Sequence, residues 1–97
     1  MRLSLRPRAE LDIDDAYVWY ESRRTGLGEN FLRSLDACFD RVRREPEIYA
    51  PRHGRVRGAR VHRFPYHVYF VIRADHIDVL SVYHDRRRPR RFDSERP

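Results

Sequence analysis

The chain has 97 residues, 40% of them hydrophobic and 37% charged, with 21 basic and 15 acidic side chains and a formal net charge of +6. A chain of this length buries about 60–65% of the surface that its unfolded form exposes, which allows one two-layer core and excludes a second domain. Cys38 is the only cysteine, so no disulfide framework exists within the chain. The longest apolar run, residues 68–72, is far shorter than the roughly 20 residues of a membrane-spanning helix, and residues 1–8 contain no signal-peptide core. We therefore expect a cytoplasmic protein.

Positive charge is concentrated in the second half of the chain. Residues 1–48 carry nine arginines and ten acidic residues, whereas residues 49–97 carry twelve arginines and five acidic residues. Lysine is absent, so every fixed positive charge is a planar guanidinium that can donate two hydrogen bonds to one phosphate or carboxylate. Such a distribution favours binding to a polyanion or to an acidic protein.

Two amphipathic helices are expected in the first half. Residues 2–6 alternate polar side chains with leucines, the pattern of a short strand, and Pro7 ends that strand. Apolar residues then recur at helical spacing over residues 9–20 and again over residues 31–42. Residues 23–28 contain two glycines and separate the two patterns. Because this connection is short, the helices are expected to pack as an antiparallel hairpin.

Three strands are expected in the second half, over residues 56–64, 67–72 and 76–84. Connections of two or three residues require antiparallel pairing, so these strands form a meander, which the strand at residues 2–6 joins at its edge or in its middle. The predicted fold is therefore α+β, in the order β-α-α-β-β-β, with the helical hairpin packed on a small antiparallel sheet. We predict one domain over residues 1–92 and a flexible tail over residues 93–97.

Both faces of the central strand carry apolar side chains, and one face is expected to receive the helices. The opposite face and its rim are then expected to display five basic side chains: Arg57, Arg60, Arg63, His67 and His84.

Several classes of site are absent from the sequence. It contains no phosphate-binding loop, zinc-ligand spacing, dinucleotide-binding fingerprint or nucleophile elbow. The five histidines lack the paired spacing of a metal site, and Cys38 lies in the apolar stripe of the second helix. We therefore expect neither a metal nor another cofactor.

Arginine, histidine and tyrosine occur together on neighbouring predicted strands. Cleavage of RNA through its own 2′-hydroxyl needs a base, an acid and cations that stabilise the phosphorane-like transition state, and these three residue types supply all of them. The same residues also suit a surface that binds a macromolecule without catalysis, or a solvated face of the sheet. Composition alone does not distinguish RNA cleavage, non-catalytic binding and a solvated face.

Several short motifs occur in a fixed order along nearly the whole chain: Ala-Glu-Leu-Asp-Ile at 9–13, Trp-Tyr at 19–20, Phe-Leu at 31–32, Arg-Glu-Pro at 44–46, Val-Arg-Gly-Ala-Arg at 56–60, Phe-Pro-Tyr-His-Val-Tyr-Phe at 64–70, and Val-Tyr-His-Asp-Arg-Arg at 82–87. In this order and spacing they resemble the RelE/ParE family of toxins from bacterial type II toxin–antitoxin systems, also called plasmid stabilisation proteins. The resemblance implies a toxin that a cognate acidic antitoxin neutralises in a hetero-oligomer.

The family resemblance implies one of two targets. RelE-like members cleave mRNA on the ribosome, whereas ParE-like members poison DNA gyrase. In this chain His67 stands where RelE-like toxins have an arginine, and Phe92, near the place of their C-terminal catalytic tyrosine, has no hydroxyl. These differences favour the ParE-like activity. A non-toxic module that only binds an antitoxin is a third reading.

Each proposed activity, and the binding of the antitoxin, would involve a different set of residues. An endoribonuclease would use His84 or His67 for proton transfer and Arg60 or Arg63 for phosphate stabilisation. A surface for gyrase or nucleic acid would comprise Arg57, Arg60, Arg63, Tyr66, Arg86, Arg87, Arg88, Arg90 and Arg91. The antitoxin, through an amphipathic segment, would contact Tyr17, Tyr20, Phe31 and Leu35 on the helical hairpin.

Overall fold

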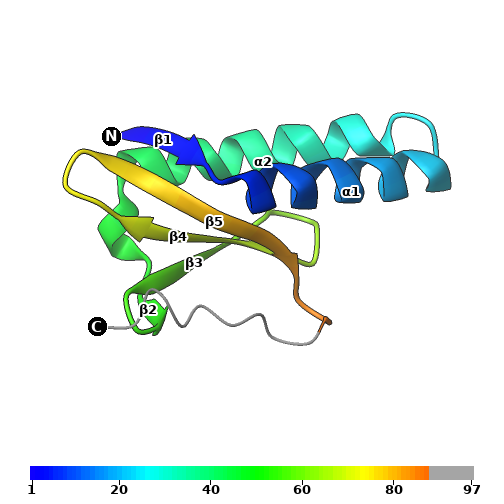
Figure 1. Ribbon diagram of the computed structural model, residues 1–97. Coiled ribbons are helices and arrows are strands. Elements are labelled where there is room, and N and C mark those ends of the chain that lie inside the picture. Colours follow the sequence, from blue (N-terminus) through cyan, green and yellow to red (C-terminus); the bar gives the residue numbers. More distant parts are fainter. Residues whose placement is uncertain (88–97) are drawn as a thin grey trace.

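The computed structural model describes residues 1–87 and places two long helices on one face of a sheet (Figure 1). The elements are β1 (Arg2–Leu5), α1 (Pro7–Arg23), α2 (Leu27–Arg44), the 3₁₀ turn η1 (Pro46–Ile48), β2 (Pro51–His53), β3 (Val56–Arg60), β4 (Tyr66–Ile72) and β5 (His76–His84). The predicted α+β fold with a helical hairpin is confirmed. The predicted tail at residues 93–97, together with Arg88, Arg90 and Arg91, lies outside the described residues.

The sheet is mixed rather than purely antiparallel, which corrects the sequence prediction. Its strand order is β1-β5-β4-β3-β2, and β1 runs parallel to β5 while the other neighbours are antiparallel. The connection from β1 to β5 contains both helices and three strands, which is long enough for the chain to return in the same direction. The sequence also did not predict β2, a three-residue edge strand that is exposed throughout and begins with Pro51.

The β3–β4 connection is longer than predicted. The strand expected over residues 56–64 ends at Arg60, because the chain turns at residues 61–65 before β4 begins at Tyr66. Arg63 in this turn has a φ of 70°, a left-handed conformation that costs a non-glycine residue about 1–3 kcal/mol. The turn lets Phe64 re-enter the core while the Arg63 side chain remains exposed.

The start of α2 depends on a side chain from α1. Gly26, the residue before the helix, has a φ of 91° and offers no side chain to cap the first turn. The Glu21 carboxylate instead accepts hydrogen bonds from the backbone N–H groups of Gly26 and Gly28, at 3.0–3.1 Å. Glu21 therefore fixes the hairpin connection and satisfies two N–H groups that the helix leaves unpaired.

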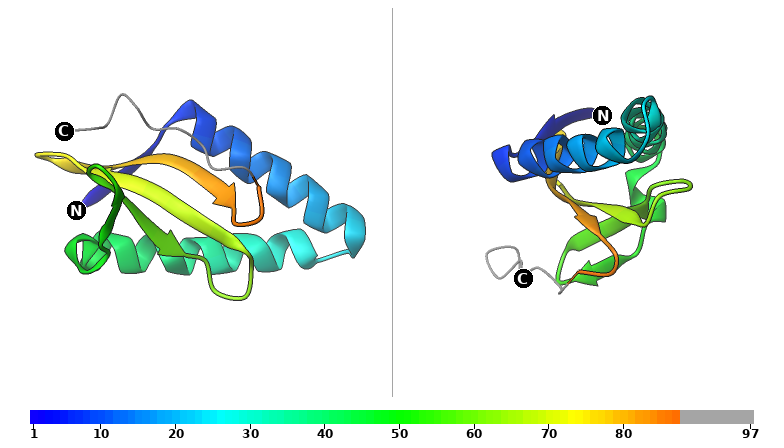
Figure 2. Two further views of the ribbon diagram at one scale, coloured as in Figure 1. Left: turned by 90° about the horizontal axis from the view of Figure 1, so that it is seen from below. Right: turned by 90° about the vertical axis from the view of Figure 1, so that its right-hand side faces the viewer.

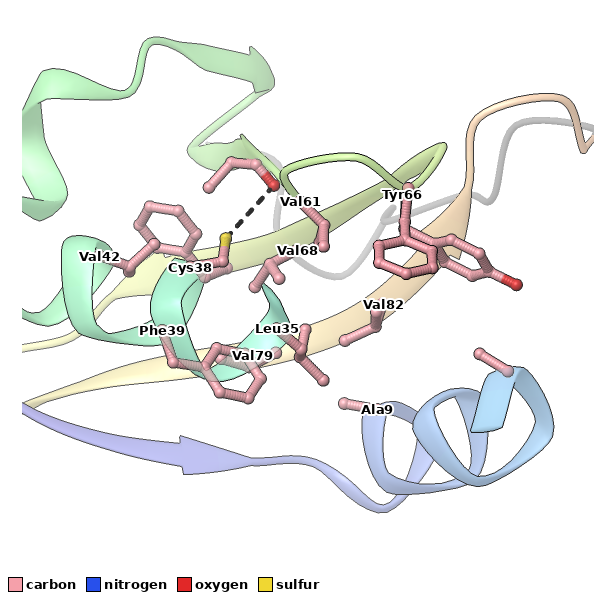
Figure 3. Close-up of a cluster of buried hydrophobic side chains, with 14 of the residues drawn as sticks. Ala9, Leu35, Cys38, Phe39, Val42, Val61, Tyr66, Val68, Val79 and Val82 are labelled. Carbon is pink, nitrogen blue, oxygen red and sulfur yellow. Dashed lines mark hydrogen bonds between the residues drawn. The ribbon is translucent and has the colours of Figure 1, made fainter. Parts of the chain in front are cut away.

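The main core lies between the helices and the sheet, and Figure 3 shows part of it. Alternate residues of β4 face the helices there, whereas Val71 joins Val56 and Leu80 in a smaller buried cluster on the opposite face. Both faces of β4 are thus apolar, as the alternation predicted. Cys38 is fully buried, its thiol points at the carbonyl oxygen of Ala59, and burial raises its pKa to about 11. This confirms the expected place of Cys38 in the apolar stripe.

Candidate functional site

Strand register divides the predicted site residues between the two faces of the sheet. Ala59 pairs with Val68, and both belong to the main core on the helix side. The next pair along, Arg60 with His67, therefore points to the opposite face. His84 pairs with Tyr66, a core residue, and so lies on the helix side. The prediction that His67 and His84 share one face is wrong. His67 pairs with Tyr83, the residue before His84, and adjacent residues of a strand point to opposite faces.

An outer-face cluster forms around His67, Asp85, Arg60 and Tyr69. His67 Nδ1 lies 2.6 Å from Asp85 Oδ1, and because a carboxylate only accepts, Nδ1 is the nitrogen that donates. The Arg60 guanidinium is 4.0 Å from the other carboxylate oxygen, and the Tyr69 ring stacks on the imidazole with centroids 6.0 Å apart. His67 is only 9% exposed, so this cluster holds it in one orientation and leaves little of the ring accessible.

A second group lies on the helix side, in a space of about 230 Å³ lined by Trp19, Tyr66, His84, Arg86 and Arg87, which we call the Trp19 pocket. The backbone N–H of Arg86 donates to His84 Nδ1 at 3.0 Å, so Nε2 carries the proton of the neutral imidazole. The Tyr66 ring packs edge-on against His84 with centroids 5.1 Å apart. Burial raises the pKa of the Tyr66 phenol, and the positive charge of Arg87 opposes that rise.

Trp19 itself is half exposed at the end of α1. The Arg23 guanidinium lies over its ring, 4.5 Å from the centroid, in a cation–π contact. Tyr20 meets the same ring edge-on at 5.0 Å and continues into the core. Arg23 and Tyr20 thus hold the indole in place, and the ring remains accessible from the pocket.

A third group, which we call the arginine pocket, lies between the start of α2 and the β3–β4 turn. This space of about 440 Å³ is lined by Arg24, Leu27, Asn30, Arg33, Ser34, Arg63 and Phe64. None of the lining residues is acidic. Within residues 1–87, no carboxylate forms an ion pair with any of its three arginines, and only Arg33 has a side-chain partner, the Asn30 amide oxygen. The pocket is therefore suited to an anion.

Arg57 has a structural role rather than a place on the open sheet face. It pairs with Phe70, a core residue, and so points to the helix side of the sheet. Its guanidinium donates to the carbonyl oxygens of Tyr49 at 2.7 Å and Glu47 at 3.3 Å, which anchors η1 to the sheet. The prediction that Arg57 is displayed on the opposite face is wrong.

Three of the four residues assigned to the antitoxin are in the core. Phe31 is fully buried, and Leu35 and Tyr20 are nearly so, because their helix faces turn toward the sheet. In this fold these side chains are not accessible to a partner, which corrects that assignment. Tyr17 is half-buried, and its hydroxyl lies 3.2 Å from Glu29 Oε1.

Sequence reasoning missed several residues of these groups. Arg24 and Arg33 carry no local pattern that sets them apart, and only the helical hairpin brings them to the β3–β4 turn. Trp19 contributed to the family resemblance but was not assigned to a site. Asp85 follows His84 in the sequence, yet its side chain hydrogen-bonds to His67. Only the strand register could show this contact.

Two further findings concern residues 1–87 as a whole. No group of three or more His, Cys, Asp or Glu side chains among them is arranged to hold a metal ion. None of the helices that they form is both long enough and apolar enough to cross a membrane.

Comparison with known proteins identifies the family. Residues 3–89 match the model of the ParE toxin of the type II toxin–antitoxin system parDE. A chain of the solved chromosomal ParDE toxin–antitoxin system from P. aeruginosa has the same fold, with a TM-score of 0.67 and 21% identity; the match covers 87% of this chain and 95% of that chain. No curated protein matches the sequence. Because the family model spans most of its length, the chain belongs to the ParE toxin family of type II toxin–antitoxin systems.

Proposed function

We propose that this ParE-family chain is a cytoplasmic growth-inhibiting toxin that acts by inhibiting DNA gyrase and is neutralised by an acidic antitoxin. Its surface binds the target, and it does not cleave RNA. One observation carries the choice of mechanism: the two histidines that could exchange protons lie on opposite faces of the sheet.

Separation of the histidines counts against a metal-free ribonuclease. Such an enzyme places its base, its acid and a phosphate-binding cation around a single phosphate, each within hydrogen-bond reach of its target atom. Here the sheet itself lies between His67 and His84, and Arg60 accompanies only His67. Arg63 belongs to the arginine pocket instead. Arginines distributed over several surfaces fit recognition of a large partner better than they fit one catalytic centre.

The antitoxin is proposed to bind the exposed part of the helical hairpin. Leu11 and Val18 of α1 are 53% and 65% exposed, are seven residues apart and therefore lie on one side of the helix. Tyr17, which precedes Val18, lies toward α2. An amphipathic antitoxin segment would cover these apolar side chains. Val18→Arg is expected to weaken antitoxin binding about tenfold or more, since it puts a charge into an apolar contact.

A supercoiling assay tests the gyrase proposal. Purified toxin is added to gyrase and relaxed plasmid, with and without the antitoxin encoded beside it, and RNA ends are sequenced from cells in which the toxin is induced. We expect loss of supercoiling, relief by the antitoxin, growth arrest and uncut messages. Arg86→Ala combined with Arg87→Ala should weaken inhibition, while Arg8→Ala combined with Arg44→Ala removes the same charge elsewhere and should not.

Other outcomes would point to the remaining readings. Unaffected supercoiling together with new cuts inside translated codons, abolished by His84→Ala, would identify a ribosome-dependent endoribonuclease. Absence of growth arrest with intact antitoxin binding would identify a non-toxic binding module. Either result would overturn the proposal.

A further inference from the structure

Two pockets with different chemistry lie close together at one end of the molecule. The α1–α2 connection, the β3–β4 turn and the end of β5 lie toward this end, on the right in Figure 1 and in the left view of Figure 2. The arginine pocket includes Phe64, and the Trp19 pocket includes Tyr66. Both rings contact Tyr20, with centroids 5.0 and 6.2 Å from it, so this aromatic layer forms the boundary between the pockets.

The first pocket has the chemistry of a phosphate site. Three guanidinium groups, an amide and a hydroxyl line it, and no carboxylate of its lining competes for them. Arg63 reaches it from a backbone conformation that non-glycine residues rarely adopt, and strain of this kind is often retained where a side chain has a binding role.

The second pocket offers aromatic rings beside positive charge. Trp19 is 50% exposed, and Arg86 and Arg87 lie next to it with His84. A base that stacks on an aromatic ring while arginines hold the neighbouring phosphates is the usual arrangement in proteins that bind single strands. A duplex does not offer its bases in this way. An acidic peptide would satisfy the arginines but would bring no flat ring to Trp19.

We propose that this end of the molecule binds single-stranded nucleic acid, with the backbone phosphates in the arginine pocket and a base stacked on Trp19. The site is separate from the outer-face cluster around His67. The inference does not depend on the gyrase proposal, because binding is measured with the toxin and an oligonucleotide alone.

Trp19 is the only tryptophan in the chain, so its emission reports on the proposed stacking directly. Purified full-length protein is titrated with single-stranded dT12, with the corresponding dA12·dT12 duplex and with poly-aspartate of equal charge. We expect dT12 to quench Trp19 emission and to bind at least about fivefold more tightly than the duplex. Poly-aspartate should leave the emission nearly unchanged.

Matched variants distinguish binding at the proposed site from non-specific electrostatic binding to a basic protein. Arg24→Ala combined with Arg63→Ala should weaken dT12 binding about tenfold. The plot of the logarithm of the binding constant against the logarithm of salt concentration should also become less steep, by roughly one for each phosphate that the variant no longer neutralises. Arg8→Ala combined with Arg44→Ala removes the same charge from exposed positions that neither pocket includes, and should change affinity less than about threefold. Trp19→Ala, followed by anisotropy of labelled dT12, should reduce affinity at least about fivefold, and Trp19→Phe should retain most of the affinity.

The proposal fails if dT12 does not quench Trp19, if the two double variants are weakened equally, or if poly-aspartate binds as tightly as dT12. Circular dichroism of each variant shows whether it is folded. If Trp19→Ala unfolds the protein, Trp19→Phe and the quenching titration of the unchanged chain still decide the question.

Discussion

At the scale of single residues, the buried carboxylates hold elements together. Asp78 on β5 accepts hydrogen bonds from Arg6, before α1, and from Arg73, in the β4–β5 turn, at 2.8–3.3 Å. Burial raises the pKa of Asp78, but the two arginines outweigh burial and lower the pKa overall. Asp12 of α1 similarly accepts from the Ser81 hydroxyl and the Val82 N–H, both at 3.0 Å, where β5 extends beyond its pairing with β1.

The lowered pKa of Asp78 predicts how stability depends on pH. A carboxyl whose pKa is lower in the folded state than its usual 3.8 stabilises the protein above pH 4, and this stability is lost as pH falls through the folded-state pKa. Asp78→Asn should therefore lower stability by about 1–3 kcal/mol at pH 7 and flatten its fall below pH 4. Urea unfolding at pH 7, 4 and 3 measures this. Asp36→Asn, at an exposed carboxyl of α2, is the control, and an equal loss there would contradict the prediction.

Arg63 has a backbone conformation that is unfavourable for arginine, but its side chain lines the arginine pocket. Its φ of 70° favours glycine, yet an arginine occupies the position. Arg63→Gly should stabilise the folded chain by about 1 kcal/mol, because the strain disappears, and should at the same time weaken dT12 binding. Thermal unfolding and the oligonucleotide titration measure the two effects. Arg63→Ala, which keeps the strain, should weaken binding without the gain in stability; a loss of stability in Arg63→Gly would show that the turn needs the arginine.

At the scale of elements, the two helices approach closely at Gly28. A Cβ placed there would lie 2.7 Å from Tyr17 Cε2 and 3.0 Å from Glu21 Oε1, the oxygen that accepts the Gly28 N–H. The first residues of α2 therefore rest directly on the ring of an α1 tyrosine. This contact and the Glu21 hydrogen bonds fix the angle of the hairpin, and with it the position of Arg24 and Arg33.

Gly28→Ala should destabilise the protein by about 1–3 kcal/mol, since the added methyl group must displace the Tyr17 ring or the Glu21 carboxylate. Thermal and urea unfolding measure the loss. Glu29→Ala is the control because it removes the hydrogen-bond partner of Tyr17 without adding an atom between the helices. A Gly28→Ala variant as stable as the unchanged chain would show that the Tyr17 ring and the Glu21 carboxylate can move aside at no cost.

At the scale of the whole molecule, an aromatic cluster joins the hairpin to the sheet. Phe31 of α2 contacts the rings of Tyr20, Phe64 and Tyr66, with centroid distances of 5.2–5.4 Å. These rings come from both helices, the β3–β4 turn and β4. The proposed nucleic-acid site lies on the outside of the same cluster, so the packing that stabilises the fold also fixes the position of the two pockets.

Phe31→Ala should cost about 3–5 kcal/mol, because it leaves a cavity at the centre of this cluster. We expect the variant to lose toxicity and antitoxin binding together, through unfolding, with a clearly lowered melting temperature. Val18→Ala, at an exposed position of α1, should change stability by less than about 0.5 kcal/mol. Selective loss of antitoxin binding in a stably folded Phe31→Ala protein would restore the assignment of Phe31 to the antitoxin surface.

The sequence by itself determined the two helices, the order of the elements and the resemblance to the toxin family, because apolar periodicity and short connections are local properties. It also placed Cys38 in the apolar stripe of the second helix and showed that both faces of β4 carry apolar side chains, but which face receives the helices came from the structure. Only the tertiary structure decided the parallel pairing of β1 with β5, the conformation of Arg63 and the face on which each basic residue lies. A shift of one position in strand register moves a side chain to the other face, and the sequence does not encode that register locally. For the same reason the separation of His67 from His84, and the meeting of Arg24, Arg33 and Arg63 around one pocket, follow from the fold alone.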